Sequence, residues 1–300
     1  MNLFHRGLEA IEAAAEQLAD VDRRFLLPAL ILQLAGLGLR AMVWRSVICA
    51  AYPKRCVPVT SVTGSFLAGV ALNSFLPAKG GEFAKLALIR SRIHDSCLST
   101  LAATLGVVML LDGLLGAALL GVLVVTGVAP VEIPSLGATP IIAAIGLVAL
   151  AAVALKLRPR RARTLVAHLA QGAAILRTPR RYLHSVLPLQ LAAWACRVGV
   201  AFLVLSAFGI QAGLATAALV VVFNGLSTAV PVPGGVGTQQ VLTAYALRGV
   251  VPLAGAVSFS VGMQVGVTLV NTLVGLTALM LMLRTVSPRA ALRFHFAASR

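Results

Sequence analysis

Two stretches of the sequence interrupt apolar runs in the same way, and both contain residues that could bind an anion. Each has a Pro-x-x-Gly-Gly motif, beginning at Pro77 in one and at Pro231 in the other, about half the chain apart. The polar and glycine residues that could form the site are Asn73, Lys79, Gly80, Gly81, Glu82 and Lys85 in the first stretch, and Asn224, Gly234, Gly235 and Gln239 in the second. Paired interruptions in corresponding halves of a membrane protein indicate a transport site.

The physical argument concerns the backbone. Proline ends a helix and the glycines free further backbone polar groups, which hydrocarbon tolerates only beside protein or a water-filled cavity. A helix restarting after Gly81 or Gly235 directs its N–H groups and its positive dipole end into that cavity, where an anion such as a lipid phosphate would bind. Lys79 and Lys85 would add positive charge. The alternative is an ordinary surface loop, with Glu82 as a first-turn residue paired with Lys79 or Lys85 rather than a functional carboxylate.

Two further charges fall near the centres of apolar runs. A central charge costs about 2.5–3.5 kcal/mol on insertion scales, so Asp112 and Arg197 should face a partner or a cavity. They are expected either to form a structural ion pair or to belong to a head-group or proton-coupling site. Arg40 and Arg45 are expected to reach the membrane interface instead.

The elements that position these residues follow from composition. The 300 residues are 59% hydrophobic and 11% charged, with a mean hydropathy of +0.95, which excludes an ordinary soluble enzyme and disorder alike. The prediction is an all-α polytopic membrane protein of two pseudo-symmetric, inverted-repeat-like halves with broken or re-entrant helices. Expected spans are 25–43, 60–76, 97–128, 140–155, 186–208, 214–230 and 253–283, although 59–91 and 214–248 could cross the membrane or turn back within it.

The expected domain organisation is simple. Residues 1–24 form an amphipathic interfacial helix, and residues 25–283 form one membrane domain with halves 25–157 and 185–283. A basic loop, 156–184, joins the halves, and a basic tail covers 284–300. Residues 156–181 contain eight cations and no acid, so the positive-inside rule places this loop, and the tail, on the cytoplasmic side of an inner membrane. The positive charge of these cytoplasmic segments accounts for the net charge of +16, so no nucleic-acid partner is expected.

The last span has two faces of interest. Ser258, Gly262 and Gly266 follow the small-xxx-small spacing that permits close helix packing. A second face, Gln264, Thr268 and Asn271, lines a polar pathway or makes interhelical hydrogen bonds. The histidines and cysteines show no catalytic or metal spacing, so no enzyme, cofactor or metal site is expected.

The motifs resemble a known family. Leu76-Pro-x-x-Gly-Gly-Glu82, then Leu86-x-x-x-Arg90 and later Leu110-Leu-Asp112, are similar to the lysylphosphatidylglycerol synthase transmembrane-region family. The second half is similar to that family's Pro-Gly-Gly-x-Gly-x-x-Glu motif, and the resemblance covers about 25–283. It departs at Gln239 and Gln240, where a glutamate is common, and at Val108-Met109, where Glu-Arg is common.

The resemblance implies a function. The family's best-known members join such a bundle, which flips a modified lipid, to a cytosolic aminoacyl-transferase domain that this sequence is expected to lack. The expected function is therefore a flippase for an anionic amphiphile, either a phospholipid or an isoprenoid-phosphate-linked precursor. The alternatives are a scaffold subunit of a lipid-modifying transferase and a small-solute transporter. Membrane lipid is the expected partner, anionic phospholipid or polyprenyl-phosphate-linked lipid, and a homo-oligomer is compatible with the sequence.

Overall fold

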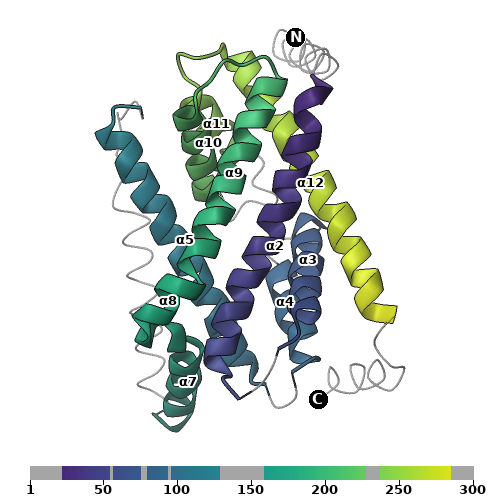
Figure 1. The fold of residues 1–300 in the computed structure, drawn as a ribbon, viewed down its shortest axis with the longest axis vertical. Helices are drawn as coiled ribbons and strands as arrows, with labels where there is room; N and C mark the ends of the chain where they lie inside the picture. The colour runs from purple at the N-terminus through teal and green to yellow at the C-terminus, as the bar shows by residue number, and fades with distance from the viewer. Residues whose placement is uncertain are drawn as a thin grey trace, which may run out of the picture.

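The computed structural model describes residues 22–54, 57–75, 80–93, 96–128, 159–227 and 237–284. Within these ranges the chain is mostly helical and contains no strand, so the all-α class is confirmed. Four helices are long and apolar enough to span a membrane and run along the bundle (Figure 1). They are α2 (Leu26–Ala51), α5 (Leu98–Val125), α9 (Leu187–Ala207) and α12 (Leu253–Arg284). The predicted interfacial helix (1–24), the span 140–155 and the tail lie almost wholly outside the described residues.

Two pairs of shorter helices complete the bundle. The first pair is α3 (Val59–Phe75) and α4 (Gly80–Arg90), and the second is α10 (Leu214–Ser227) and α11 (Thr238–Ala246). At 1.5 Å per residue, α3 is roughly 26 Å long and α10 roughly 21 Å, both shorter than the roughly 30 Å hydrocarbon core. Figure 1 shows the α3–α4 pair at one end of the bundle and the α10–α11 pair at the other.

These pairs answer a question that the sequence leaves open. The two helices of each pair pack side by side, and the chain leaves each pair at the end from which it entered, so neither α3–α4 nor α10–α11 crosses the bundle (Figure 1). The pseudo-twofold relation between the halves stays a prediction. Most of both Pro-x-x-Gly-Gly motifs lies outside the described residues, which leave out 76–79 and 228–236.

Glycines set the packing of the first pair. A Cβ on Gly81 would meet the carbonyl oxygen of Gly69 and both the backbone and the side chain of Asn73, so α3 and α4 touch through bare backbone. On α12, the close contact lies at Gly275, which rests against the Leu67 carbonyl and Ala71 of α3. The predicted close packing is not seen at Gly266, where no atom of another described helix lies within 4 Å of a Cβ placed on the glycine.

The first span also differs from its expected bounds. Helix α2 continues past 43 to Ala51, because Trp44, Val47 and Ile48 are fully buried and make that last part a packing surface. The helix ends only where the chain reaches Tyr52, whose backbone no longer has helical dihedral angles.

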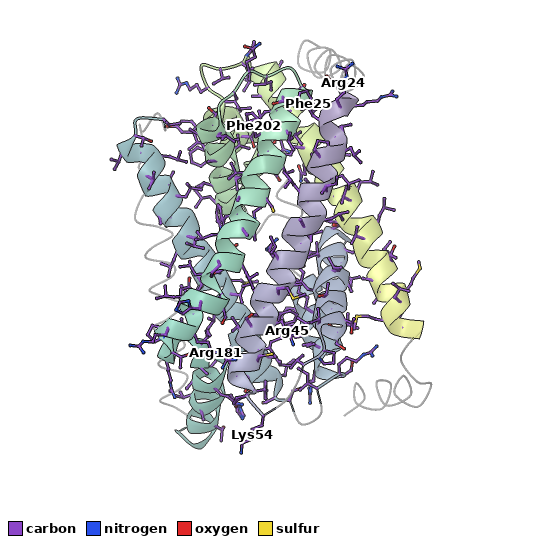
Figure 2. The ribbon with its side chains drawn as sticks, viewed as in Figure 1. Arg24, Phe25, Arg45, Lys54, Arg181 and Phe202 are labelled. Carbon is purple, nitrogen blue, oxygen red and sulfur yellow. The ribbon has the colours of Figure 1, made fainter. Side chains whose placement is uncertain are left out.

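Short helices cover one end of the bundle: α7 (Pro159–Gly172), η3 (Ala174–Arg177) and α8 (Pro179–Ser185). Helix α7 packs on α5 where Gly172 lies against the Thr100 carbonyl, and Gln171 Nε2 donates to the Ala51 carbonyl at 3.1 Å. Figure 2 shows Arg45, Lys54 and Arg181 towards this end, with Arg24 at the other.

Candidate functional site

A cavity of about 60 Å³ lies within the bundle and is lined by residues of α2, α3, α4, α5 and α9. Apolar side chains form much of its wall, but four charged residues line it: Arg40, Glu82, Lys85 and Asp112. It has room for a few water molecules. In this conformation it would therefore admit one small polar group rather than a whole lipid head group.

The first ion pair of the cavity belongs to α4. Lys85 Nζ lies 2.8 Å from Glu82 Oε1, and Asn73 Nδ2 of α3 donates to the same oxygen at 2.9 Å. Lys85 is only 3% exposed, and its ammonium sits 4.5 Å from the centre of the Phe66 ring. The predicted pairing of Glu82 with a nearby lysine is confirmed for Lys85. The other lysine, Lys79, lies outside the described residues.

The second ion pair joins α5 to α9. Arg197 donates to Asp112 Oδ2 at 2.9 Å, and Trp194 Nε1 donates to Asp112 Oδ1 at 2.8 Å. The Arg197 guanidinium also packs over the Trp194 ring, 4.9 Å from its centre. The expected pairing of Asp112 with Arg197 is confirmed, and both carboxylate oxygens of Asp112 are satisfied.

Arg40 is the residue that the sequence interpretation misplaced. Its side chain does not extend to the membrane interface but lines the cavity beside the two ion pairs. The Arg40 guanidinium lies 5.6 Å from the centre of the Phe66 ring. No carboxylate among the described residues lies within ion-pair distance of it. The signal was present in the sequence, because Arg40 stands in the interior of an apolar run, four residues before Trp44.

The second helix pair, α10–α11, supplies no charge to this cavity from its described residues. Asn224 Oδ1 accepts from Thr243 at 3.1 Å, and Gln240 Nε2 donates to Gln264 Oε1 of α12 at 2.8 Å. Asn224 and Gln239 do not line the cavity, and Gly234 and Gly235 lie outside the described residues.

The glycines of the first helix pair, α3–α4, affect the cavity only through helix packing. Gly80 begins α4 and Gly81 lets it pack on α3, so both position Glu82 and Lys85 rather than line the cavity. On α12, Gln264 and Asn271 form interhelical hydrogen bonds, the latter with Gln33 of α2 at 2.9 Å.

A separate polar cluster lies where α5 begins. Cys97, the residue before the helix, has its sulfur 3.0 Å from Ser99 Oγ and 3.5 Å from His168 Nδ1 of α7. The hydrogen bond with Ser99 is the main cause that lowers the pKa of the Cys97 thiol. In the described part of the chain, no group of three His, Cys, Asp or Glu residues could hold a metal ion.

Comparison with known proteins agrees with the motifs. The family model of the lysylphosphatidylglycerol synthase TM region matches residues 8–275, which include both helix pairs and every charged residue of the cavity. No curated protein and no solved structure matches the chain. Since the match covers most of the sequence, the chain belongs to the lysylphosphatidylglycerol synthase TM-region family.

Proposed function

We propose that the protein translocates an anionic amphiphile, a phospholipid or an isoprenoid-phosphate-linked lipid, with its anionic group passing through the cavity. The charge of the cavity is the observation that carries the proposal. Among the described residues, the cations Arg40, Lys85 and Arg197 face only two carboxylates, Glu82 and Asp112. One positive charge is left without a counter-charge inside the bundle.

An unmatched charge at this depth is costly, by about 2.5–3.5 kcal/mol on insertion scales. A bound anion would place a counter-charge beside Arg40, which makes the cavity a receptor for negative charge. Arginine suits a phosphate, because its planar guanidinium can donate two parallel hydrogen bonds to two phosphate oxygens.

The cavity wall favours a lipid over a soluble anion. Met109 of α5 lines the cavity and is 45% exposed, so one side chain of the cavity wall also belongs to the outer surface of the bundle. A head group could enter here while its acyl chains stay in the bilayer. A small-solute transporter remains the second candidate, since it needs the same charge but only aqueous access. A scaffold subunit would need no charged cavity.

The remaining features of the proposal concern place and partners. We assign the end with α7 and α8 to the cytoplasm of an inner membrane, because Lys54 and Arg181 are exposed there. We assign no enzyme activity, cofactor or nucleic-acid partner to the chain, and membrane lipid is its proposed ligand.

The test is a flipping assay in liposomes, using fluorescent phosphatidylglycerol as the anionic probe and phosphatidylcholine as the zwitterionic one. Native mass spectrometry of the purified protein would first identify any lipid that co-purifies. Arg40→Gln should slow the movement of the anionic probe at least tenfold, whereas Arg24→Gln, at an exposed site in the short 3-10 helix Arg23–Phe25 just before α2, should not. Lys85→Ala should give a partial loss, and the double change with Lys79→Ala a larger one. Wild-type rates in Arg40→Gln and in the double lysine variant would refute the proposal.

A further inference from the structure

We infer that Glu82 takes up a proton when the cavity binds its anion, so that the protein couples the anion to a proton. The inference adds an energy source to the proposed function, and it starts from two oxygen atoms without partners. Glu82 Oε2 and Asn73 Oδ1 are buried, and neither has a hydrogen-bond donor among the described residues. A buried acceptor without a donor costs about 1–3 kcal/mol.

The two oxygens belong to one hydrogen-bonded pair. Asn73 Nδ2 already donates to Glu82 Oε1, which fixes the orientation of the amide and leaves Asn73 Oδ1 as an acceptor. An ionised carboxylate can only accept, whereas a protonated one also donates. A proton on Oε2 would turn that oxygen into a donor beside a residue that has an unused acceptor.

The other carboxylate of the cavity shows the contrast. Asp112 accepts from Trp194 through one oxygen and from Arg197 through the other, so the ionised form is satisfied at both atoms. Glu82 instead receives both of its donors, Asn73 and Lys85, at Oε1. Of the two carboxylates, Glu82 is therefore the one with a place for a proton.

Anion binding supplies the coupling. Lys85 lines the cavity and is the only cation among the described residues at ion-pair distance from Glu82, 2.8 Å from Oε1. An anion that attracts Lys85 removes this counter-charge, and a carboxylate left unpaired inside the bundle is favoured in its neutral form. By linkage, proton binding at Glu82 must then strengthen anion binding by the same factor.

The charged groups around Glu82 come from four of the five helices that line the cavity. Arg40 lies on α2, Lys85 on α4 and Asp112 on α5, and Arg197 of α9 is paired with Asp112, while α3 contributes only the neutral Asn73 and Phe66. The sum is one positive charge when the cavity is empty. It is unchanged when a monoanion and one proton enter together. The proton comes from water on one side, resides on Oε2 and leaves to water on the other.

The first experiment needs no transport. Short-chain phosphatidylglycerol is added to the detergent-solubilised protein in weak buffer, and proton uptake is read with a pH dye. The wild type should take up about one proton per bound lipid, and Glu82→Gln none. Glutamine is the matched replacement, because its amide can donate to Asn73 Oδ1 and still accept at the other atom. Asp22→Asn removes an exposed carboxylate outside the cavity and should retain the uptake.

Infrared difference spectra should show the carbonyl band of a protonated carboxylic acid in the wild type and in Asp22→Asn, and lack it in Glu82→Gln. In liposomes, a pH gradient should drive the anionic probe to accumulate in one leaflet with the wild type, but not with Glu82→Gln. Lipid binding without proton uptake, or an acid band that survives Glu82→Gln, would overturn the inference. A sodium dependence in place of the proton dependence would also overturn it.

The experiments separate this inference from the proposed function. Flipping that ignores the gradient leaves lipid translocation standing and rejects the coupling. If no anionic lipid binds or moves, the proposed function fails, and the acid band alone then decides whether Glu82 is a proton site.

Discussion

The ion pair between Asp112 and Arg197 offers a quantitative test of the structure. Removing one partner of a fully buried pair costs about 3–5 kcal/mol, because the other charge is left without a counter-charge. Here the two side chains are 27% and 24% exposed, so solvent reduces the cost. We therefore expect Asp112→Asn to lower the free energy of unfolding by about 2 kcal/mol. Asparagine can still accept from Trp194, so this value reports mainly the isolated charge on Arg197.

The double variant isolates the pair. Arg197→Gln alone should also cost about 2 kcal/mol, since it leaves Asp112 with only its hydrogen bond from Trp194. The double variant contains no isolated charge and should cost only about 2 kcal/mol in total, which gives a coupling of about 2 kcal/mol.

The assay is reversible denaturation in detergent micelles, followed by circular dichroism of the helices. The control cycle combines Asp112→Asn with Arg24→Gln, whose exposed side chain should show no coupling. Additive costs in the double variant of Asp112 and Arg197 would show that the two charges do not stabilise each other.

Three further substitutions test the unmatched charge of Arg40, the packing of α4 on α3 and the Cys97 thiol. Arg40→Met should raise the free energy of unfolding by about 1 kcal/mol while it slows flipping, because it removes an unmatched charge; a destabilised variant in the same denaturation assay would contradict this. Gly81→Leu should abolish folding, whereas Gly266→Leu, at a site with open space, should purify as a monodisperse protein on size exclusion; equal behaviour of the two would contradict the packing. Iodoacetamide should alkylate Cys97 at a lower pH than an ordinary thiol, and Ser99→Ala should raise that pH; an unchanged pH profile by mass spectrometry would refute the role of the hydrogen bond.

The sequence determined the class of the protein and much of its organisation. A composition with 59% hydrophobic residues and long apolar runs admits only a helical membrane bundle among ordinary folds. The cost of a charge in hydrocarbon was enough to predict that Asp112 has a cationic partner, and Arg197 was the cation available in another span. The Pro-x-x-Gly-Gly motifs located both breaks and indicated the family, which the match over residues 8–275 confirms.

Only the tertiary structure decided which face of each helix looks inward. In a soluble helix the polar stripe marks the outer face. A spanning helix is apolar all round, so periodicity does not distinguish the face that packs in the bundle from the face that contacts lipid. The sequence therefore could not show that Arg40 lines a cavity, or that Gly275 rather than Gly266 touches a neighbouring helix. Both facts depend on α3, which packs beside α2 and α12. The position of a neighbouring helix is not encoded in the local sequence pattern of either partner.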